Sequence, residues 1–202
     1  FKSKLTPSGN VVTEKRDVDE FSAIEVSGIF KVEIVAQKDF AIEVESDDNI
    51  LPHIKTEVED GVLTISKKGF SMKSFRSFKA TIRISAPNIE RLEVSGVTKT
   101  TLANLSSESL HIDMNGASKI QVDGKVTDLK VDMNGASKLD AKNLKTENAT
   151  IEGSGASRSY VRAVGKLSAD LSGASRVNYY GEPGEIKKDT SGASSLKQLK
   201  EE

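Results

Sequence analysis

The sequence predicts an all-β protein whose C-terminal half winds as a parallel β-solenoid. The first observation is a corner word of the form Asn/Ser-Gly-Ala-Ser, which occurs six times with small variations. Its glycines follow one another at steps of 20, 19, 20, 18 and 19 residues, a period typical of solenoid repeats. The second observation is the alternation of apolar and polar residues between the corners, which indicates strands rather than helices. The six words occupy residues 95–98, 115–118, 134–137, 154–157, 172–175 and 191–194.

The residues on either side of a corner fit two short strands. Leu129, Val131 and Met133 precede the third word, and Leu139 and Ala141 follow it. Two strands and two turns fill a repeat of about 19 residues, and such a unit cannot bury its apolar face alone. We therefore expect each coil to stack on the next, with hydrogen-bonded strands about 4.8 Å apart.

The corner residues suit a tight bend that recurs in every coil. Glycine permits a positive φ at such a bend, and the Asn or Ser before it can bond to nearby backbone. We expect the alanine after each glycine to point inward, because it is small enough for the place where two sheets converge. The predicted structural corner consists of Gly96, Gly116, Gly135, Gly155, Gly173 and Gly192 together with Ala117, Ala136, Ala156, Ala174 and Ala193.

No stretch of linker composition divides the chain, so residues 1–202 are predicted to form a single domain. Within this domain, residues 87–199 are the regular Gly-Ala-Ser solenoid. Residues 11–86 alternate less strictly, and we interpret them as irregular opening coils and a cap of the same solenoid. Strands are expected near residues 21–35, 41–45, 62–66 and 80–84, and residues 67–78 are expected to form a loop that mixes basic and apolar side chains.

Charged residues recur at fixed positions beside the corners. An acid stands three residues before each glycine: Glu93, Asp113, Asp132, Glu152, Asp170 and Asp189. A base stands three residues after five of the glycines: Lys99, Lys119, Lys138, Arg158 and Arg176. Stacked coils would turn these residues into two ladders. They form either a solvated edge on which the two ladders neutralise each other, or a charged strip that binds a divalent cation, a glycan or a protein.

Two smaller groups of side chains also leave alternatives open. His111 and Asp113 are two residues apart on one expected strand, so they share a face. They form either a surface pair or half of a metal or acid–base site. Tyr160, Tyr179 and Tyr180 follow neighbouring corners and form either an exposed aromatic patch or part of the core.

Composition and motifs argue against several functional classes. Lys plus Arg is 29 and Asp plus Glu is 30, a balance that argues against nucleic-acid partners. The chain has no Cys and two His, which excludes thiolate metal sites, a Cys nucleophile and a three-His metal site within one chain. The corner serines lack a recurring base, so we expect them to bond within turns rather than to act as nucleophiles. We expect no cofactor, no resident metal and no catalytic residue.

Three segments carry a resemblance to a known family. They are the opening Arg16-Asp17-Val18-x-x-Phe21-x-x-Ile24-x-Val26-x-Gly28, the strand Asp60-Gly61-x-Leu63-x-Ile65, and the repeated corner words. Together they resemble the head GIN domain family of putative auto-transporter-like adhesins, a domain of unknown function found mostly in Bacteroidetes-type bacteria. The resemblance covers residues from about Val12 to Leu196. It implies a single-stranded right-handed parallel β-helix that is exported to the periplasm or the cell surface behind a secretion or lipoprotein signal, and it supplies no catalytic residues.

Three functional hypotheses follow. The first is a non-enzymatic exported binding module or adhesin that contacts a protein or glycan on a cell surface, with membrane association only through an upstream lipid anchor. The second is a carbohydrate-active β-helix enzyme, a polysaccharide lyase or hydrolase, which needs unlike residues to converge on a few coils. The third is a passive envelope scaffold that forms homo-oligomers. The acids repeat uniformly, and such columns are typical of structure, which argues against the second hypothesis.

Overall fold

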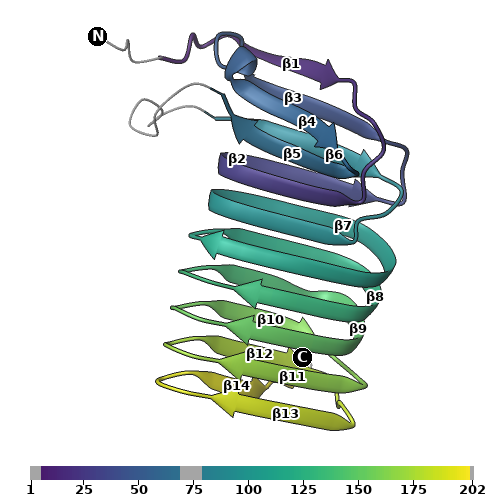
Figure 1. Cartoon of the computed structure of the whole chain (residues 1–202), viewed down its shortest axis with the longest axis vertical. Helices are drawn as coiled ribbons and strands as arrows, with labels where there is room; N and C mark the ends of the chain where they lie inside the picture. Colours follow the sequence, from purple (N-terminus) through teal and green to yellow (C-terminus); the bar gives the residue numbers. More distant parts are fainter. Residues whose placement is uncertain (1–5, 69–78, 201–202) are drawn as a thin grey trace.

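The computed structural model describes residues 6–68 and 79–200, which form one elongated stack of strands (Figure 1). Residues 69–78, most of the segment expected to be a basic and apolar loop, lie outside the described residues. The N-terminal elements are β1 (Val11–Arg16), β2 (Ala23–Ala36), β3 (Ala41–Asp47), the 3₁₀ turn η1 (Leu51–His53), β4 (Ile54–Glu59), β5 (Val62–Lys67) and β6 (Thr81–Ala86). The C-terminal elements are β7 (Arg91–Gly116), β8 (Lys119–Met133), β9 (Lys138–Gly153), β10 (Arg158–Arg162), β11 (Lys166–Leu171), β12 (Arg176–Tyr180), β13 (Glu185–Thr190) and β14 (Ser195–Gln198).

The described residues are thus an all-β structure without an α-helix. No helix in this part of the chain has both the length and the apolar character needed to cross a membrane. The strands share one 14-stranded sheet with both parallel and antiparallel pairs.

Strands β7 to β14 pair with one another in parallel. The register places equivalent positions of successive repeats side by side: Lys119 lies opposite Lys138, and Arg158 lies opposite Arg176. In the later repeats the strand before a corner and the strand after it are separate elements, whereas β7, β8 and β9 each continue from one corner to the next. Positions at a fixed distance from the corner glycine therefore form columns along the stack.

Each corner glycine lies against the backbone of the glycine one coil earlier. The amide of Ala136 donates a hydrogen bond of 2.9 Å to the carbonyl oxygen of Gly116. Gly135 has a φ of +89°, and a Cβ atom on it would lie 2.6 Å from that same oxygen. The column begins above the repeat, because Gly96 packs in the same way on Gly28. Glycine is therefore required here for two reasons, the positive φ and the close approach of two backbones.

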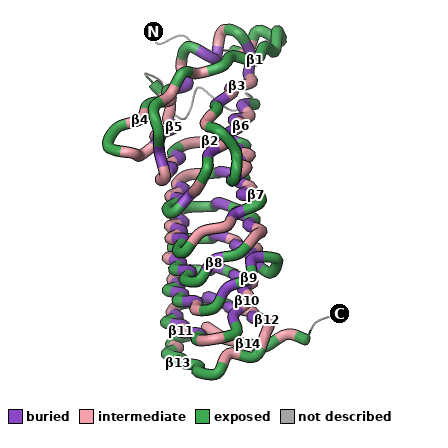
Figure 2. Tube along the Cα trace, turned by 90° about the vertical axis from the view of Figure 1, so that its right-hand side faces the viewer, coloured by how far each residue is buried: buried purple, intermediate pink, exposed green. Residues whose placement is uncertain are grey.

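The core fills the interior of the stack from β2 to β12, whereas β1 and β13 have no buried residue (Figure 2). Ile112, Val131 and Ile151 are adjacent members of one column, and each is at most 1% exposed. The column continues with Ala169 and then Lys188, so a lysine occupies the apolar position in the last described coil. A charged residue at such a position discourages further strands from adding to the edge.

The expectation that the corner alanines point inward is wrong. Ala117 is exposed, whereas Ser118 after it is 3% exposed. The reason is the alternation of the following strand: Ser118 stands two residues before buried Ile120 and is therefore in phase with the inward set. Ser137, Ser157 and Ser175 are buried at the equivalent positions, and the hydroxyl of Ser157 donates to the Ser175 hydroxyl over 3.0 Å. The exposed members of the alanine column are Ala117, Ala136, Ala156, Ala174 and Ala193.

The N-terminal part departs from the expected opening coils. Only β2 follows the coil path, pairing in parallel with β7 on one side and with β5 and β6 on the other. The pairs β1–β3, β3–β6 and β4–β5 are antiparallel. The β4–β5 hairpin follows from Asp60 and Gly61, which both have positive φ and form the two-residue turn that joins antiparallel neighbours. A description of residues 11–86 as opening coils is therefore wrong for these strands.

We expect Gly135→Ala to lower the free energy of unfolding by about 3 kcal/mol or more, because it adds backbone strain and a clash with Gly116. Gly61→Ala is the matched control: Gly61 also has a positive φ, but nothing lies within 4 Å of its Cβ position. Its expected cost is only the strain, about 1–2 kcal/mol. Urea unfolding measures both values, and equal losses would contradict the stacking requirement.

We expect Thr100→Val to raise the free energy of unfolding by about 1 kcal/mol. Thr100 is 1% exposed between Val32 and Ile120, and its hydroxyl has no hydrogen-bond partner among the described residues. The substitution removes an unpaired buried polar group while it keeps the shape of the side chain. Thermal and urea unfolding test it against Thr127→Val at an exposed position of β8, and a loss of stability in the Thr100 variant would contradict the expectation.

Candidate functional site

Two charged columns flank the stacked corners. The acids lie before each corner and the bases after it; at the first corner Glu93 and Lys99 both belong to β7, which runs through that corner. We call the first column, Glu93, Asp113, Asp132, Glu152, Asp170 and Asp189, the acidic ladder. We call the second column, Lys99, Lys119, Lys138, Arg158 and Arg176, the basic strip.

The acidic ladder is in register over its lower five members. Asp113 lies opposite Asp132, Asp132 opposite Glu152, Glu152 opposite Asp170, and Asp170 opposite Asp189. At the upper end Glu93 lies opposite Glu25, a member that the sequence analysis did not assign to the ladder. The similarity of the segments 25–28 and 93–96 was the signal that could have found it.

The basic strip is in register as well. Lys99 lies opposite Lys119, and the column continues through Lys138, Arg158 and Arg176 to Ser195. Lys31 stands opposite Lys99 and extends the column upward, but it is paired with Glu33. All members of the strip are exposed except Lys138, which is partly buried and lies 5.5 Å from the ring centre of Tyr160.

The two columns do not neutralise each other through direct contacts. Residues 6–68 and 79–200 contain no ion pair between the acidic ladder and the basic strip. The bend of the corner lies between the two columns, which explains why they do not neutralise each other through direct contacts. The five cations of the basic strip form no ion pair with any described residue.

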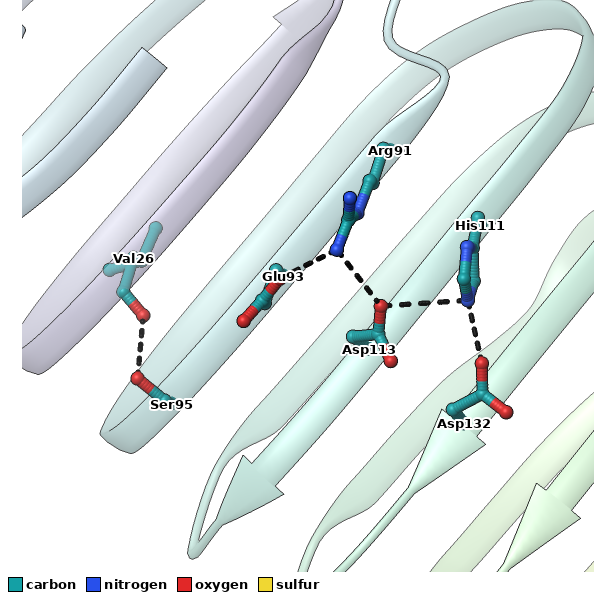
Figure 3. Close-up of polar contacts among 7 residues, drawn as sticks. All are labelled: Val26, Arg91, Glu93, Ser95, His111, Asp113 and Asp132. Atoms are coloured by element: carbon teal, nitrogen blue, oxygen red, sulfur yellow. Dashed lines mark hydrogen bonds and ion pairs between the residues drawn. The ribbon is translucent and has the colours of Figure 1, made fainter. Parts of the chain in front are cut away.

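The upper part of the acidic ladder instead contacts the column beside it on the same strands (Figure 3). Arg91 lies 2.8 Å from Glu93 and 3.6 Å from Asp113. His111 Nε2 lies 3.5 Å from Asp113 and 2.6 Å from an oxygen of Asp132. Sequence reasoning paired His111 with Asp113 but missed Asp132, because that contact joins two coils and depends on their register.

The lower part of the acidic ladder lacks such compensation. Glu152 and Asp170 lie opposite each other and are exposed, and neither has an ion pair within the described part of the chain. A pocket of about 210 Å³ lies beside them. It is lined by Asp132, Met133, Asn134, Glu152, Gly153, Ser154, Asp170 and Ser172.

One of the three tyrosines lies in the core and the other two lie at the surface. Tyr179 is 8% exposed and belongs to the core. Tyr160 and Tyr180 are partly exposed, and each lies near a cation, Lys138 for Tyr160 and Arg162 for Tyr180. Two tyrosines on the outer face therefore adjoin cations of the same sheet, an arrangement that stabilises both groups modestly.

A further charged cluster lies on the N-terminal strands. Arg83 donates two hydrogen bonds of 3.1 Å to Glu45 and lies 3.5 Å from Glu33. A hydrogen bond from Lys31 lowers the pKa of Glu33 below its ordinary value, while burial opposes this effect. The charges of this cluster compensate one another, so it presents less unpaired charge than the basic strip.

Comparisons with known proteins agree with this architecture. A family model described as "Putative auto-transporter adhesin, head GIN domain" matches residues 20–183. A solved structure described as a putative adhesin from Bacteroides fragilis NCTC 9343 has a TM-score of 0.76 at 20% identity, covering 96% of this chain and 99% of that chain. No curated protein was found to match.

Two further solved structures are similar in fold. A putative adhesin from Parabacteroides merdae ATCC 43184 has a TM-score of 0.59 at 18% identity, covering 96% of this chain and 98% of that one. A protein described as a putative lipid binding protein from Parabacteroides distasonis ATCC 8503 has a TM-score of 0.53 at 17% identity with the same coverage. At these identities the likeness shows a shared fold.

We expect Glu152→Gln to raise the free energy of unfolding by about 0.5 kcal/mol at low salt, because it removes repulsion from Asp170 across the strand pair. Asp113→Asn is the contrasting variant, since it removes a carboxylate that Arg91 and His111 contact, and we expect a loss of about 0.5–1 kcal/mol. Both differences should shrink in 1 M salt, where the screening length falls to about 3 Å. Urea unfolding at two salt concentrations tests the pair, and changes of the same sign in both variants would contradict this account of the ladder.

Proposed function

The chain belongs to the head GIN domain family of putative auto-transporter adhesins, and from this premise we propose that it is a non-enzymatic, exported binding module of the cell surface or periplasm. The family description and the adhesin descriptions of two structural neighbours support this assignment. Membrane association would come through a lipid anchor ahead of these residues.

We further propose that residues 1–202 act as one domain and that residues 87–199 wind as a single-stranded right-handed parallel β-helix with about 19 residues per coil. The parallel pairs from β7 to β14 and the stacked corner glycines support this description. A repeated rigid coil matters for function because it holds side chains of one kind at a fixed spacing along one face.

The basic strip is the observation that carries the proposed contact surface. Its cations follow one another at the strand spacing of roughly 4.8 Å, and like charges at this separation repel by about 1 kcal/mol per neighbour in water. The described residues offer these cations no carboxylate partner, whereas Arg83 and Arg91 elsewhere on the surface are paired. An anionic ligand would remove this repulsion, so binding of an anion to the strip is electrostatically favourable, most of all at low salt.

The form of the strip favours a polymer as that ligand. A row of five equivalent cations matches a chain with regularly repeated negative charges, and each further contact adds avidity without a new kind of site. Tyr160 beside Lys138 adds an aromatic surface on which a sugar ring can lie. We therefore propose an acidic polysaccharide, a glycan of the kind exposed on cell surfaces, as the partner.

Catalysis on the same polymer would need a different arrangement. A lyase or hydrolase brings unlike groups together over a few coils, such as two carboxylates placed on either side of a glycosidic bond. The basic strip repeats one kind of group, which suits recognition along a chain better than reaction at one bond.

We expect the protein to bind polygalacturonate at low salt and to bind uncharged dextran at least tenfold more weakly. The variant Lys119→Glu/Lys138→Glu/Arg158→Glu should lose at least tenfold in affinity for polygalacturonate, because it reverses the middle of the strip. Biolayer interferometry over a range of salt concentrations measures binding, and release of reducing or unsaturated ends over the same period measures turnover.

The matched control is Lys125→Glu/Lys142→Glu/Lys145→Glu, which changes the net charge equally at exposed positions outside the strip. We expect a loss below threefold. Equal losses in both variants would mean that net charge rather than the strip governs binding. No binding of either polymer would overturn the ligand class, and polymer cleavage would replace the binding module with an enzyme.

A further inference from the structure

Three potential metal-ligand atoms converge in the upper half of the acidic ladder (Figure 3). They are Nε2 of His111 and one carboxylate oxygen each of Asp113 and Asp132, and all three lie within 4.8 Å of one another. His111 and Asp113 come from β7 and Asp132 comes from β8. The group therefore joins two successive coils and exists only when they stack in the observed register.

The separations suit a small divalent cation. Ligand bonds of about 2.1 Å in a tetrahedral site place neighbouring donor atoms about 3.4 Å apart. His111 Nε2 lies 3.5 Å from Asp113 Oδ2, which is close to this value. It lies 2.6 Å from Asp132 Oδ2. To bind one ion, these two atoms must move apart by less than 1 Å, which rotation of the side chains can provide.

The three side chains are sheltered but not closed off from solvent. Their exposed fractions are 34% for His111, 22% for Asp113 and 19% for Asp132. A cation can therefore reach the donor atoms, and water can fill the remaining coordination position. Partial burial also strengthens attraction between the cation and the carboxylates relative to a fully exposed cluster.

The mixture of donors distinguishes this place from the rest of the ladder. An imidazole nitrogen with two carboxylates suits zinc and similar transition ions, whereas Ca²⁺ prefers oxygen ligands alone. The column of His111 continues with Lys130, Thr150 and Ser168, none of which could serve as an imidazole ligand. The described coils thus hold this combination once.

Two cations compete for the same carboxylates. Arg91 lies 3.6 Å from Asp113, and Lys130 lies 3.6 Å from Asp132. They weaken the attraction for a bound ion, and in its absence they compensate part of the charge of the acidic ladder. A bound ion must replace the contacts of Arg91 and Lys130 with the two carboxylates. Removal of these two cations should therefore raise the affinity for the ion.

We propose that His111, Asp113 and Asp132 bind one divalent transition cation of the zinc class and that the ion links the coils of β7 and β8. The proposal goes beyond the proposed contact with a polysaccharide and does not depend on it, because the basic strip lies on the strands after the corners. Ca²⁺ should bind this site much more weakly.

The test uses the full chain after treatment with a chelator. Isothermal titration calorimetry with Zn²⁺ should show one site per chain, and Co²⁺ should give the intense visible absorption of a four-coordinate ion. His111→Gln should lose at least tenfold in Zn²⁺ affinity and the Co²⁺ absorption. His53→Gln is the control, because His53 lies at η1 outside the cluster, and it should retain both signals.

A second variant tests the competition directly. Arg91→Gln/Lys130→Gln should bind Zn²⁺ at least threefold more tightly than the original chain, because it removes both competing cations. Unchanged or weaker binding in this variant would overturn the proposal, as would a wild-type chain that binds no Zn²⁺ or a His111→Gln variant that binds as well as wild type. Thermal unfolding without metal checks that His111→Gln is folded; if it is not, the Arg91 and Lys130 comparison decides.

Discussion

The corner glycines of successive coils lie so close together that a side chain on any of them would clash with the backbone of the glycine one coil earlier. The amide after each glycine donates to the carbonyl of the glycine one coil earlier, as from Ala156 to Gly135 and from Ala174 to Gly155. These contacts fix the register of the coils at the same place in every repeat. Because a strand has a side-chain period of two, a fixed register also fixes which residues face the core and which face solvent. The columns of apolar, hydroxyl and charged side chains all follow from this constraint.

A fixed register also makes like charges neighbours, and these charges are compensated differently on the two sides of the corners. On the strands before the corners, Arg91 and Lys130 stand next to the upper acids and compensate part of their charge, and His111 contacts Asp132. On the strands after the corners the basic strip has no equivalent acidic column beside it. The column two residues further along the outer face contains Glu33, Thr101, Gln121 and Asp140, so its acids are isolated. Of these two acids, Glu33 pairs with Lys31 and not with a member of the basic strip. The two faces thus differ in how much uncompensated charge they present to a partner.

In the N-terminal part, strand direction is not set by stacked corners. Its strands alternate like those of the repeat, and Ile42, Val44 and Ile82 are buried as alternation predicts. Alternation does not determine strand direction, however, because a strand buries the same residues whichever way it runs. The short turn at Asp60 and Gly61 decides that β5 returns antiparallel to β4. Contacts outside the repeat therefore close the stack at this end with antiparallel strands.

The sequence by itself determined that the chain is all-β, where the corners lie, and which residues between them are buried, such as Val131 and Leu139. Six similar words and a period-two pattern carry that information locally, and the phase of Ser118 with Ile120 was readable there as well. The sequence could not determine the direction of the N-terminal strands or the contact from His111 to Asp132. Each of these depends on the path and register of neighbouring strands, which are set by packing and backbone hydrogen bonds between segments far apart in the chain. The tertiary structure alone decided them, because a donor and an acceptor on different coils become neighbours only when the glycines beside them have stacked.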